Sequence, residues 1–181
     1  MSIIPITVYG DKILRQKTKN VEKVDDVLIK NIQDMFQTMR YANGVGLAAN
    51  QVGLDKSVFV IDLKEVEGYE EFKPIVMINP EIILLSDEIV TIDEGCLSLP
   101  NLRAEVDRPA SVKIKFLNTD EQEEEIEADD FFARVIQHEY DHLIGKMIPD
   151  RVNEKIRKKL QKDLKNITER NVDIDYPITE K

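Results

Sequence analysis

Cysteine, histidine and tryptophan are scarce in this sequence. Its 181 residues include one cysteine, two histidines and no tryptophan. A lone cysteine cannot form an intramolecular disulfide, which excludes the disulfide-stapled folds of small secreted proteins. We therefore expect a protein of a reducing compartment, with the cytoplasm as its location.

Long apolar runs and a targeting signal are also missing. The longest apolar stretches, such as residues 58–61 and 82–85, are far shorter than the roughly 20 residues of a membrane-spanning helix. Residues 1–7 have neither the basic start nor the apolar segment of a signal peptide. The formal net charge of −10 counts against binding of nucleic acid by the surface as a whole. These absences predict a protein with no membrane and no DNA among its partners.

The composition is otherwise typical of a globular protein. Apolar residues make up 42% of the chain, which is long enough to bury a sizeable core. No internal repeat or low-complexity segment divides it. We predict a single domain over residues 1–170 and a polar tail over residues 171–181 that frays.

Apolar spacing predicts helices near both ends of the chain and one between them. The first begins after Asp25, which can cap it, and ends at Asn43-Gly44. The second runs over residues 131–144 and ends near Gly145. The third covers residues 152–168 and is basic. Each apolar stripe is expected to pack on the core.

Strands are predicted in the middle of the chain. Because no helix separates them, we expect antiparallel pairing. Residues 64–73, which are polar and rich in Glu, are expected to form a surface loop. The acidic run 120–130 is expected to form a turn and an edge strand, with Asp129 and Asp130 capping the helix that follows. The predicted strands are Ser57–Leu63, Ile75–Asn79, Glu81–Leu85, Ile89–Ile92 and Ser111–Leu117.

Both histidines lie in one pentapeptide, His138-Glu139-Tyr140-Asp141-His142. Residues four apart share one face of a helix, so two imidazoles at this spacing can bind one divalent metal. Glu139, beside the first histidine, can then act as general base toward a metal-bound water. The apolar stripes of this helix put the pentapeptide on its buried side.

A catalytic site of this kind normally has a third protein ligand. Helical HExxH peptidases take it downstream, where this chain offers only Glu154, Glu169 and Glu180. Upstream stands Cys96, the only thiol, directly after Gly95, which lets the backbone turn sharply. Cys96 is the best candidate, because a thiolate and two imidazoles leave one position for water.

A third motif is the run of small residues from Gly44 to Gln51. Small side chains permit the close approach of another backbone, such as a substrate strand, and Gln51 supplies an amide donor. The run is not a phosphate loop, because no Lys-Ser/Thr follows it and no G-x-G-x-x-G is present.

These three motifs resemble those of the peptide deformylases, G-φ-G-φ-A-A-x-Q, E-G-C-L-S and Q-H-E-x-D-H, where φ is apolar. They lie at Gly44–Gln51, Glu94–Ser98 and Gln137–His142, in the family's order. The likeness covers roughly residues 3 to 165. Within the family, the chain resembles the type 1 branch. The resemblance implies a metal-dependent hydrolase that removes the N-formyl group from the formyl-methionine of nascent polypeptides and releases formate.

The resemblance also implies a metal site. Cys96, His138 and His142 would hold one divalent ion, with Fe²⁺ favoured and Zn²⁺, Ni²⁺ or Co²⁺ as other occupants. The ligand set itself suits iron and zinc alike. A thiolate beside Fe²⁺ predicts inactivation by oxidation.

Roles for three catalytic groups follow from the same resemblance. Glu139 would take a proton from water and later pass it to the leaving amine. The metal, the side-chain amide of Gln51 and the backbone N–H of Leu97 would stabilise the oxyanion.

The resemblance further implies how substrate binds. An extended peptide would pair with backbone near Val45, Gly46 and Gly95. Its methionine side chain would enter an apolar pocket near Val45, Phe131, Val135 and His138.

Supporting residues are implied as well. Glu94 and Arg103 match a supporting pair of the family. Asp141 would help to orient the metal ligands without binding the metal itself. Two positions depart from the commoner pattern. Asp130 stands where many members have glycine, and Arg134, whose aliphatic stem alone suits the pocket wall, stands where some have an apolar residue.

Two alternatives remain open on the residues alone. The first is a zinc endopeptidase, which would share the HExxH chemistry but lacks its downstream ligand here. The second is a non-enzymatic module that binds the ribosome through the basic helix 152–168. Residues 151–170 hold eight bases and three acids, a net charge of +5.

For the fold, we predict the α+β class. Antiparallel β-sheets would pack around a central metal-binding HExxH helix, with an N-terminal and a C-terminal helix outside.

Overall fold

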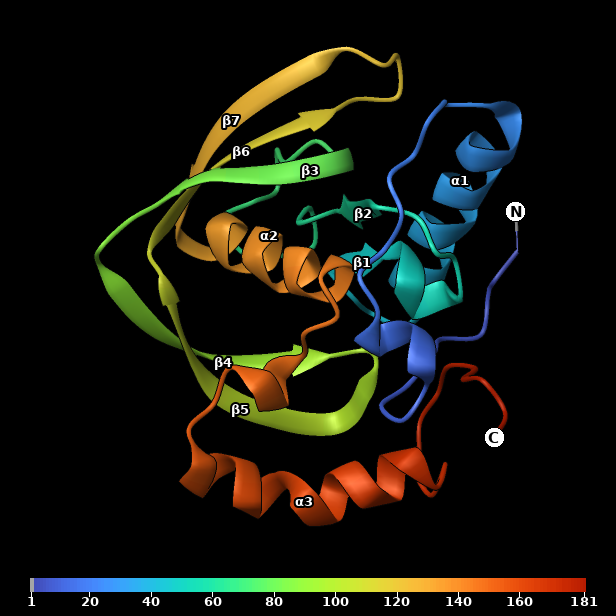
Figure 1. Cartoon of the computed structure of the whole chain (residues 1–181), viewed down its shortest axis with the longest axis vertical. Helices are drawn as coiled ribbons and strands as arrows, with labels where there is room; N and C mark the ends of the chain where they lie inside the picture. The colour runs from blue at the N-terminus through green and yellow to red at the C-terminus, as the bar shows by residue number, and fades with distance from the viewer. Residues whose placement is uncertain (1) are drawn as a thin grey trace.

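Antiparallel sheets and α-helices build residues 2–181, the part of the chain that the computed structural model describes (Figure 1). The α-helices are α1 (Asp26–Tyr41), α2 (Asp130–Leu143) and α3 (Glu154–Thr168). The strands are β1 (Gly46–Ala48), β2 (Val58–Ile61), β3 (Ile75–Leu85), β4 (Ile89–Cys96), β5 (Leu99–Pro109), β6 (Ser111–Leu117) and β7 (Glu123–Asp129). Three short 3₁₀ helices, η1 (Lys12–Arg15), η2 (Ala49–Val52) and η3 (Ile148–Asp150), complete the elements within these residues.

The strands form a large and a small sheet. The large sheet has the order β1-β2-β3-β6-β7, the small one pairs β4 with β5, and each of these pairings is antiparallel. The predicted strands 75–79 and 81–85 are one strand, β3. Its register against β6 shifts between Ile78 and Glu81, because Pro80 lacks the N–H that a regular ladder needs.

Helix α2 lies between the two sheets (Figure 1). Its buried apolar residues, among them Ile136 and Leu143, join one cluster with Phe59 and Phe116 of the large sheet. The other two helices cover outer faces. The fully buried strand β2 has one face in the cluster with α2 and the other in the cluster with α1, as its two-residue period requires.

Helix α3 covers the small sheet. Its buried apolar side chains, Leu160, Leu164 and Ile167, pack with Leu102 and Val106 of β5. The predicted combination of antiparallel sheets with three helices is therefore confirmed at the level of fold class. No helix within residues 2–181 combines the length and the apolar character needed to cross a membrane.

The predicted helix ends agree with the structure at α1. The Asp25 side chain accepts a hydrogen bond from the Leu28 N–H at 2.8 Å, and Asn43 takes a left-handed φ of 55° just after the helix. At α2 the capping prediction is wrong. Asp129 occupies the cap position without a side-chain capping bond. Strand β7 ends at Asp129 and the helix begins at the next residue, Asp130, whose φ is 50°.

Strand β5 was not predicted. Pro100 and Pro109 bound it, and Arg108 interrupts the otherwise apolar inward face formed by Leu102, Ala104 and Val106. The run 123–129 is the expected edge strand, β7.

The loop over residues 64–73 has an aromatic anchor that its polar composition concealed. Tyr69 packs edge-on against Phe131, with ring centroids 6.3 Å apart, and Phe72 packs against Phe132 at 5.0 Å. The Tyr69 hydroxyl also accepts a hydrogen bond from the Phe132 N–H at 3.3 Å. These contacts attach the loop to the first turn of α2.

The tail over residues 171–181 is not frayed, contrary to expectation. Ile178 pairs with Ile6 in a parallel bridge. The Ile6 N–H donates to the Pro177 carbonyl at 2.9 Å, and the Thr179 N–H donates to the Ile6 carbonyl at 3.0 Å. Polar composition concealed this docking, because backbone pairing and polar side-chain bonds hold the tail and neither requires an apolar stripe.

Candidate active site

One thiol and two imidazoles converge where β4 ends beside α2. The Cys96 Sγ lies 3.2 Å from the His142 Nε2, which lies 3.3 Å from the His138 Nε2. The three ligand atoms lie within 4.8 Å of one another. The structure thus brings together the three residues that were predicted as metal ligands from separate parts of the sequence.

The donor set fits a divalent transition metal. Two imidazole nitrogens and one thiolate are the ligands of zinc and iron sites with one open position. Burial lowers the pKa of His142 well below its ordinary value, which keeps that ring in the neutral form that binds metals.

A buried carboxylate orients His138. The His138 Nδ1 lies 2.9 Å from the Glu94 Oε2. Burial alone would raise the pKa of Glu94, but hydrogen bonds from His138 and Arg108 hold it well below its usual range. An ionised carboxylate can only accept, so the His138 Nδ1 carries the proton and the Nε2 lone pair faces the ligand cluster.

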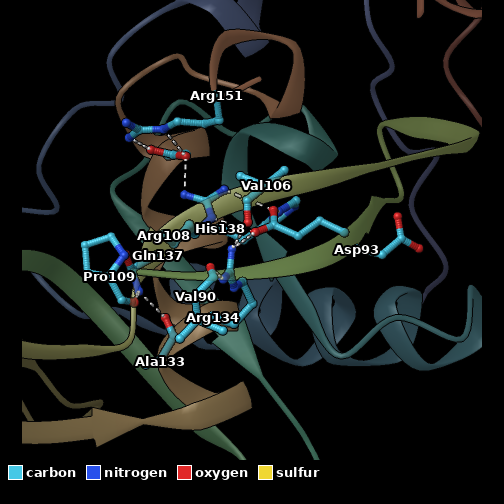
Figure 2. Close-up of polar contacts among 12 residues, drawn as sticks. Val90, Asp93, Val106, Arg108, Pro109, Ala133, Arg134, Gln137, His138 and Arg151 are labelled. Carbon is cyan, nitrogen blue, oxygen red and sulfur yellow. Dashed lines mark hydrogen bonds and ion pairs between the residues drawn. The ribbon is translucent and has the colours of Figure 1, made fainter. Parts of the chain in front are cut away.

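The partner of Glu94 is Arg108, and the predicted pairing with Arg103 is wrong. Arg108 donates to Glu94 through Nε at 2.6 Å and Nη2 at 3.0 Å. Arg103 instead pairs with Asp93 at 2.6 Å on the exposed face, and Figure 2 shows Asp93 apart from the buried cluster. The two-residue period of a strand explains the difference, because Arg103 and Arg108 lie on opposite faces of β5.

Arg134, labelled in Figure 2, and Asp141 extend the buried group formed by Glu94, Arg108 and His138. Arg134 donates through Nη1 to Glu94 and to the Val106 carbonyl, both at 2.8 Å, and through Nη2 to the Val90 carbonyl. Its guanidinium is therefore bound to the small sheet. Asp141 accepts from Arg108 Nη1 at 2.7 Å, so it reaches His138 only through Arg108 and Glu94.

Glu139 lies beside the ligands in a nearly closed environment. Its side chain is buried, and its Oε2 has no hydrogen-bond partner among the residues described. Burial raises the pKa of Glu139 to about 7. A carboxylate in this state can take up and release a proton near neutral pH.

Gly46 makes room for Glu139, a role that the sequence did not reveal. A Cβ built on Gly46 would lie 2.8 Å from the Glu139 Cδ, which is closer than side chains tolerate. The glycine in this motif is therefore required by the carboxylate opposite it, in addition to any approach of substrate.

Gln51 is held in one orientation. Its Oε1 accepts from the Ala48 N–H at 2.8 Å, and its Nε2 donates to the Ser98 Oγ at 3.1 Å while lying 3.7 Å from the Cys96 Sγ. Leu97, which follows Cys96, belongs to the two-residue turn between β4 and β5. The amide of Gln51 and the residue after the thiol thus meet at the same end of the cavity.

A cavity of about 540 Å³ opens over these groups, a size suited to small ligands and peptide ends. Its lining includes every residue that was predicted to bind substrate, namely Val45, Gly46, Gly95, Phe131 and Val135. Arg134 also contributes to the lining, and so does Tyr176 from the C-terminal tail, which was not predicted.

Comparison with known proteins decides the family. The family model described as Polypeptide deformylase matches residues 3–158. The chain belongs to the peptide deformylase family. The peptide deformylase of Prosthecochloris aestuarii is 40% identical over 178 residues, which cover 98% of this chain and 95% of that protein.

Solved deformylase structures share the fold. The enzyme of Thermotoga maritima superposes with a TM-score of 0.79 at 41% identity, covering 84% of this chain and 99% of that one. A plant peptide deformylase gives 0.88 at 37% identity, covering 94% and 92%. This deformylase is accordingly a metal-dependent hydrolase that removes the formyl group from the N-terminal methionine of nascent polypeptides. The endopeptidase and the non-enzymatic alternatives are set aside.

Proposed function

We propose that this deformylase works through one divalent ion held by Cys96, His138 and His142. The observation that carries the proposal is the convergence of their three ligand atoms within 4.8 Å of one another at the base of the cavity. When bound, such an ion supplies Lewis-acid chemistry, lowering the pKa of water and polarising a carbonyl. Fe²⁺ is the favoured ion, with Zn²⁺, Ni²⁺ and Co²⁺ as other occupants.

Glu139 moves the proton in this proposal. Its Oε2 accepts the proton of the attacking water and later delivers it to the nitrogen of the leaving amine. Support comes from the position of Glu139 beside His138 and from the absence of any partner for Oε2 among residues 2–181. A carboxylate already engaged by an arginine, as Glu94 is, would be a poor proton carrier.

Gln51 and Leu97 supply donors for the oxyanion. The Gln51 Oε1 is already engaged by the Ala48 N–H, which leaves the Nε2 directed toward Cys96 and Ser98. The backbone N–H of Leu97 is the second donor in the proposal. Preorganised donors of this kind typically contribute about 10²–10³ each in rate.

The substrate backbone binds along the edge strand β1 of the large sheet. Strand β1 stands at one end of the large sheet and pairs only with β2, so an extended peptide can add to its free edge. We place the peptide between Val45–Gly46 and Gly95, with its methionine side chain against Phe131 and Val135.

The basic helix α3 supports a docking role at the ribosome, within the cytoplasm. Its apolar face is buried on β5, while its basic side chains are exposed. Those exposed side chains are Lys155, Arg157, Lys158, Lys159, Lys162 and Lys165. A positive face of this kind fits phosphate-rich RNA.

Release of formate from formyl-Met-Ala-Ser tests the catalytic roles. Glu139→Gln keeps the shape of the side chain but cannot carry the proton, so turnover should collapse while bound metal stays at wild-type level. The matched control is Glu105→Gln on the exposed face of β5, which should retain full activity. An active Glu139→Gln enzyme would contradict the assignment, and internal cleavage of an unformylated peptide would point to endopeptidase activity.

A further inference from the structure

The C-terminal tail returns to the hairpin that carries Cys96. Besides its bridge to Ile6, the tail is tied down by Thr179, whose hydroxyl donates to the Asp11 Oδ2 at 2.7 Å. The Arg170 guanidinium also bonds the Asp11 carboxylate, and the Asn101 side chain donates to the Asp173 carbonyl at 2.9 Å. These bonds hold the segment in one place against the body of the protein.

Between these anchors, Tyr176 reaches the active site. Its hydroxyl donates to the carbonyl of Leu97 at 2.9 Å, and the same side chain lines the catalytic cavity. Tyr176 is separated from Leu97 by 79 positions in the sequence. The contact therefore depends entirely on the docking of the tail.

The two-residue turn that Tyr176 contacts is also held by the pairing of Cys96 with Leu99, by packing of the Leu97 side chain and by two hydrogen bonds of Ser98. The Ser98 carbonyl accepts from the Tyr9 N–H at 2.9 Å, and the Ser98 Oγ accepts from the Gln51 Nε2 at 3.1 Å. Leu97 lies between this fixed serine and the Cys96 ligand. The hydroxyl of Tyr176 holds the Leu97 carbonyl, and so limits rotation of the residue whose N–H is the proposed oxyanion donor.

We propose that Tyr176 is a positioning residue for deformylation, acting through the Leu97 carbonyl to hold the Leu97 N–H toward the cavity. The proposal rests on the proposed role of the Leu97 N–H. It makes residues 171–181 a part of the active-site architecture, although they supply no metal ligand and no proton carrier.

The test is Tyr176→Phe in the full-length, metal-loaded protein, which removes one hydroxyl and keeps the ring. The control is Tyr41→Phe, at an exposed tyrosine of α1. For Tyr176→Phe we expect kcat to fall about three- to tenfold, the loss of one neutral hydrogen bond. KM and metal content should stay unchanged, because the ring of Tyr176 that lines the cavity is kept and the metal ligands are untouched. Tyr41→Phe should match the wild type.

A second measurement follows Leu97 directly. In the zinc-loaded protein labelled with ¹⁵N-leucine, Tyr176→Phe should shift the Leu97 amide resonance and speed its hydrogen exchange, while Tyr41→Phe should leave both unchanged. An unmoved Leu97 amide would overturn the proposal. A shifted amide with wild-type kcat would also overturn it, since the contact would then be structural only. Absence of formate release from all three proteins would instead refute the proposed function.

Discussion

Glu94 and Arg108 form a buried bidentate ion pair, and the Glu94 carboxylate also contacts the His138 ring. Both side chains are at most 5% exposed, and two hydrogen bonds join them at 2.6 and 3.0 Å. Arg134 shares the same carboxylate. Glu94 thus pairs with two buried guanidinium groups while orienting a metal ligand, and Asp141 supplies Arg108 with a second buried carboxylate.

Removal of that carboxylate should be costly in two ways. Glu94→Ala leaves Arg134 with an uncompensated buried charge and Arg108 with Asp141 as its one carboxylate, so the free energy of unfolding should fall by about 3–5 kcal/mol. Metal affinity should also fall by about 10- to 100-fold, because the His138 ring loses its orienting bond. Urea unfolding and metal titration measure the two effects. Asp93→Asn, next in sequence but in an exposed pair, should cost at most about 1 kcal/mol, and equal losses in both variants would contradict the assignment.

Gly46→Ala should act on the general base. The new methyl group would overlap the Glu139 carboxylate, so kcat should drop by at least about tenfold, the scale of a displaced proton carrier. A double-mutant cycle locates the cause: in the Glu139→Gln background, Gly46→Ala should have little further effect on the residual rate. Full additivity would mean that the methyl group blocks substrate instead.

Backbone conformation at the start of α2 makes Asp130→Gly and Asp130→Ala unequal. Both remove the carboxylate at this left-handed position, but only glycine adopts its positive φ without a steric penalty. Alanine should therefore be the less stable variant by about 1 kcal/mol, which thermal unfolding of the two proteins measures directly. Equal stability would indicate that α2 begins differently in solution.

The thiolate ligand makes oxidation a test of the metal. The iron-loaded enzyme should lose activity on exposure to peroxide and oxygen, because Fe²⁺ beside Cys96 promotes oxidation of metal and sulfur. The zinc-loaded enzyme, whose ion has no redox chemistry, should decay more slowly under the same exposure. Equal lifetimes for the two forms would contradict the prediction.

Charge reversal on α3 tests contact with the ribosome. Lys155→Glu with Lys162→Glu changes the exposed face while leaving the buried apolar face in place. We expect the double variant to pellet less with ribosomes than the wild type does. We also expect its binding to depend less steeply on salt concentration. The control pair, Lys17→Glu with Lys23→Glu, changes the net charge equally at exposed positions outside α3. Equal binding by both pairs would remove α3 from the interface.

Much of the helical framework follows from the sequence, because apolar stripes and caps are local signals. The ligand cluster could also be predicted, since Cys96 was the only thiol available to two histidines at helical spacing. The choice between Arg103 and Arg108 could not. It depends on which residues of β5 face α2, and β5 itself carries two prolines and mixed charges that conceal a strand.

The tail illustrates a second kind of failure. Nothing in the composition of residues 171–181 marks Tyr176 as a contact of Leu97, because the tail docks through pairing with Ile6 and polar bonds to residues far away in the sequence. Gly46 is a third case. Its small size is visible in the sequence, but the carboxylate that requires it comes from a helix far along the chain.

The position of α2 between two sheets has a mechanical consequence. Toward the large sheet it presents apolar side chains, whose attraction is non-directional. Toward the small sheet its bonds are directional and charged, from Arg134 to two strand carbonyls and from His138 to Glu94. The directional bonds to the small sheet therefore fix the position of α2 along its axis. The apolar contact with the large sheet holds α2 in place between the two sheets. Cooling weakens the hydrophobic contact with the large sheet but leaves the directional bonds to the small sheet in place. The spacing between Cys96 and the two histidines should therefore vary little with temperature.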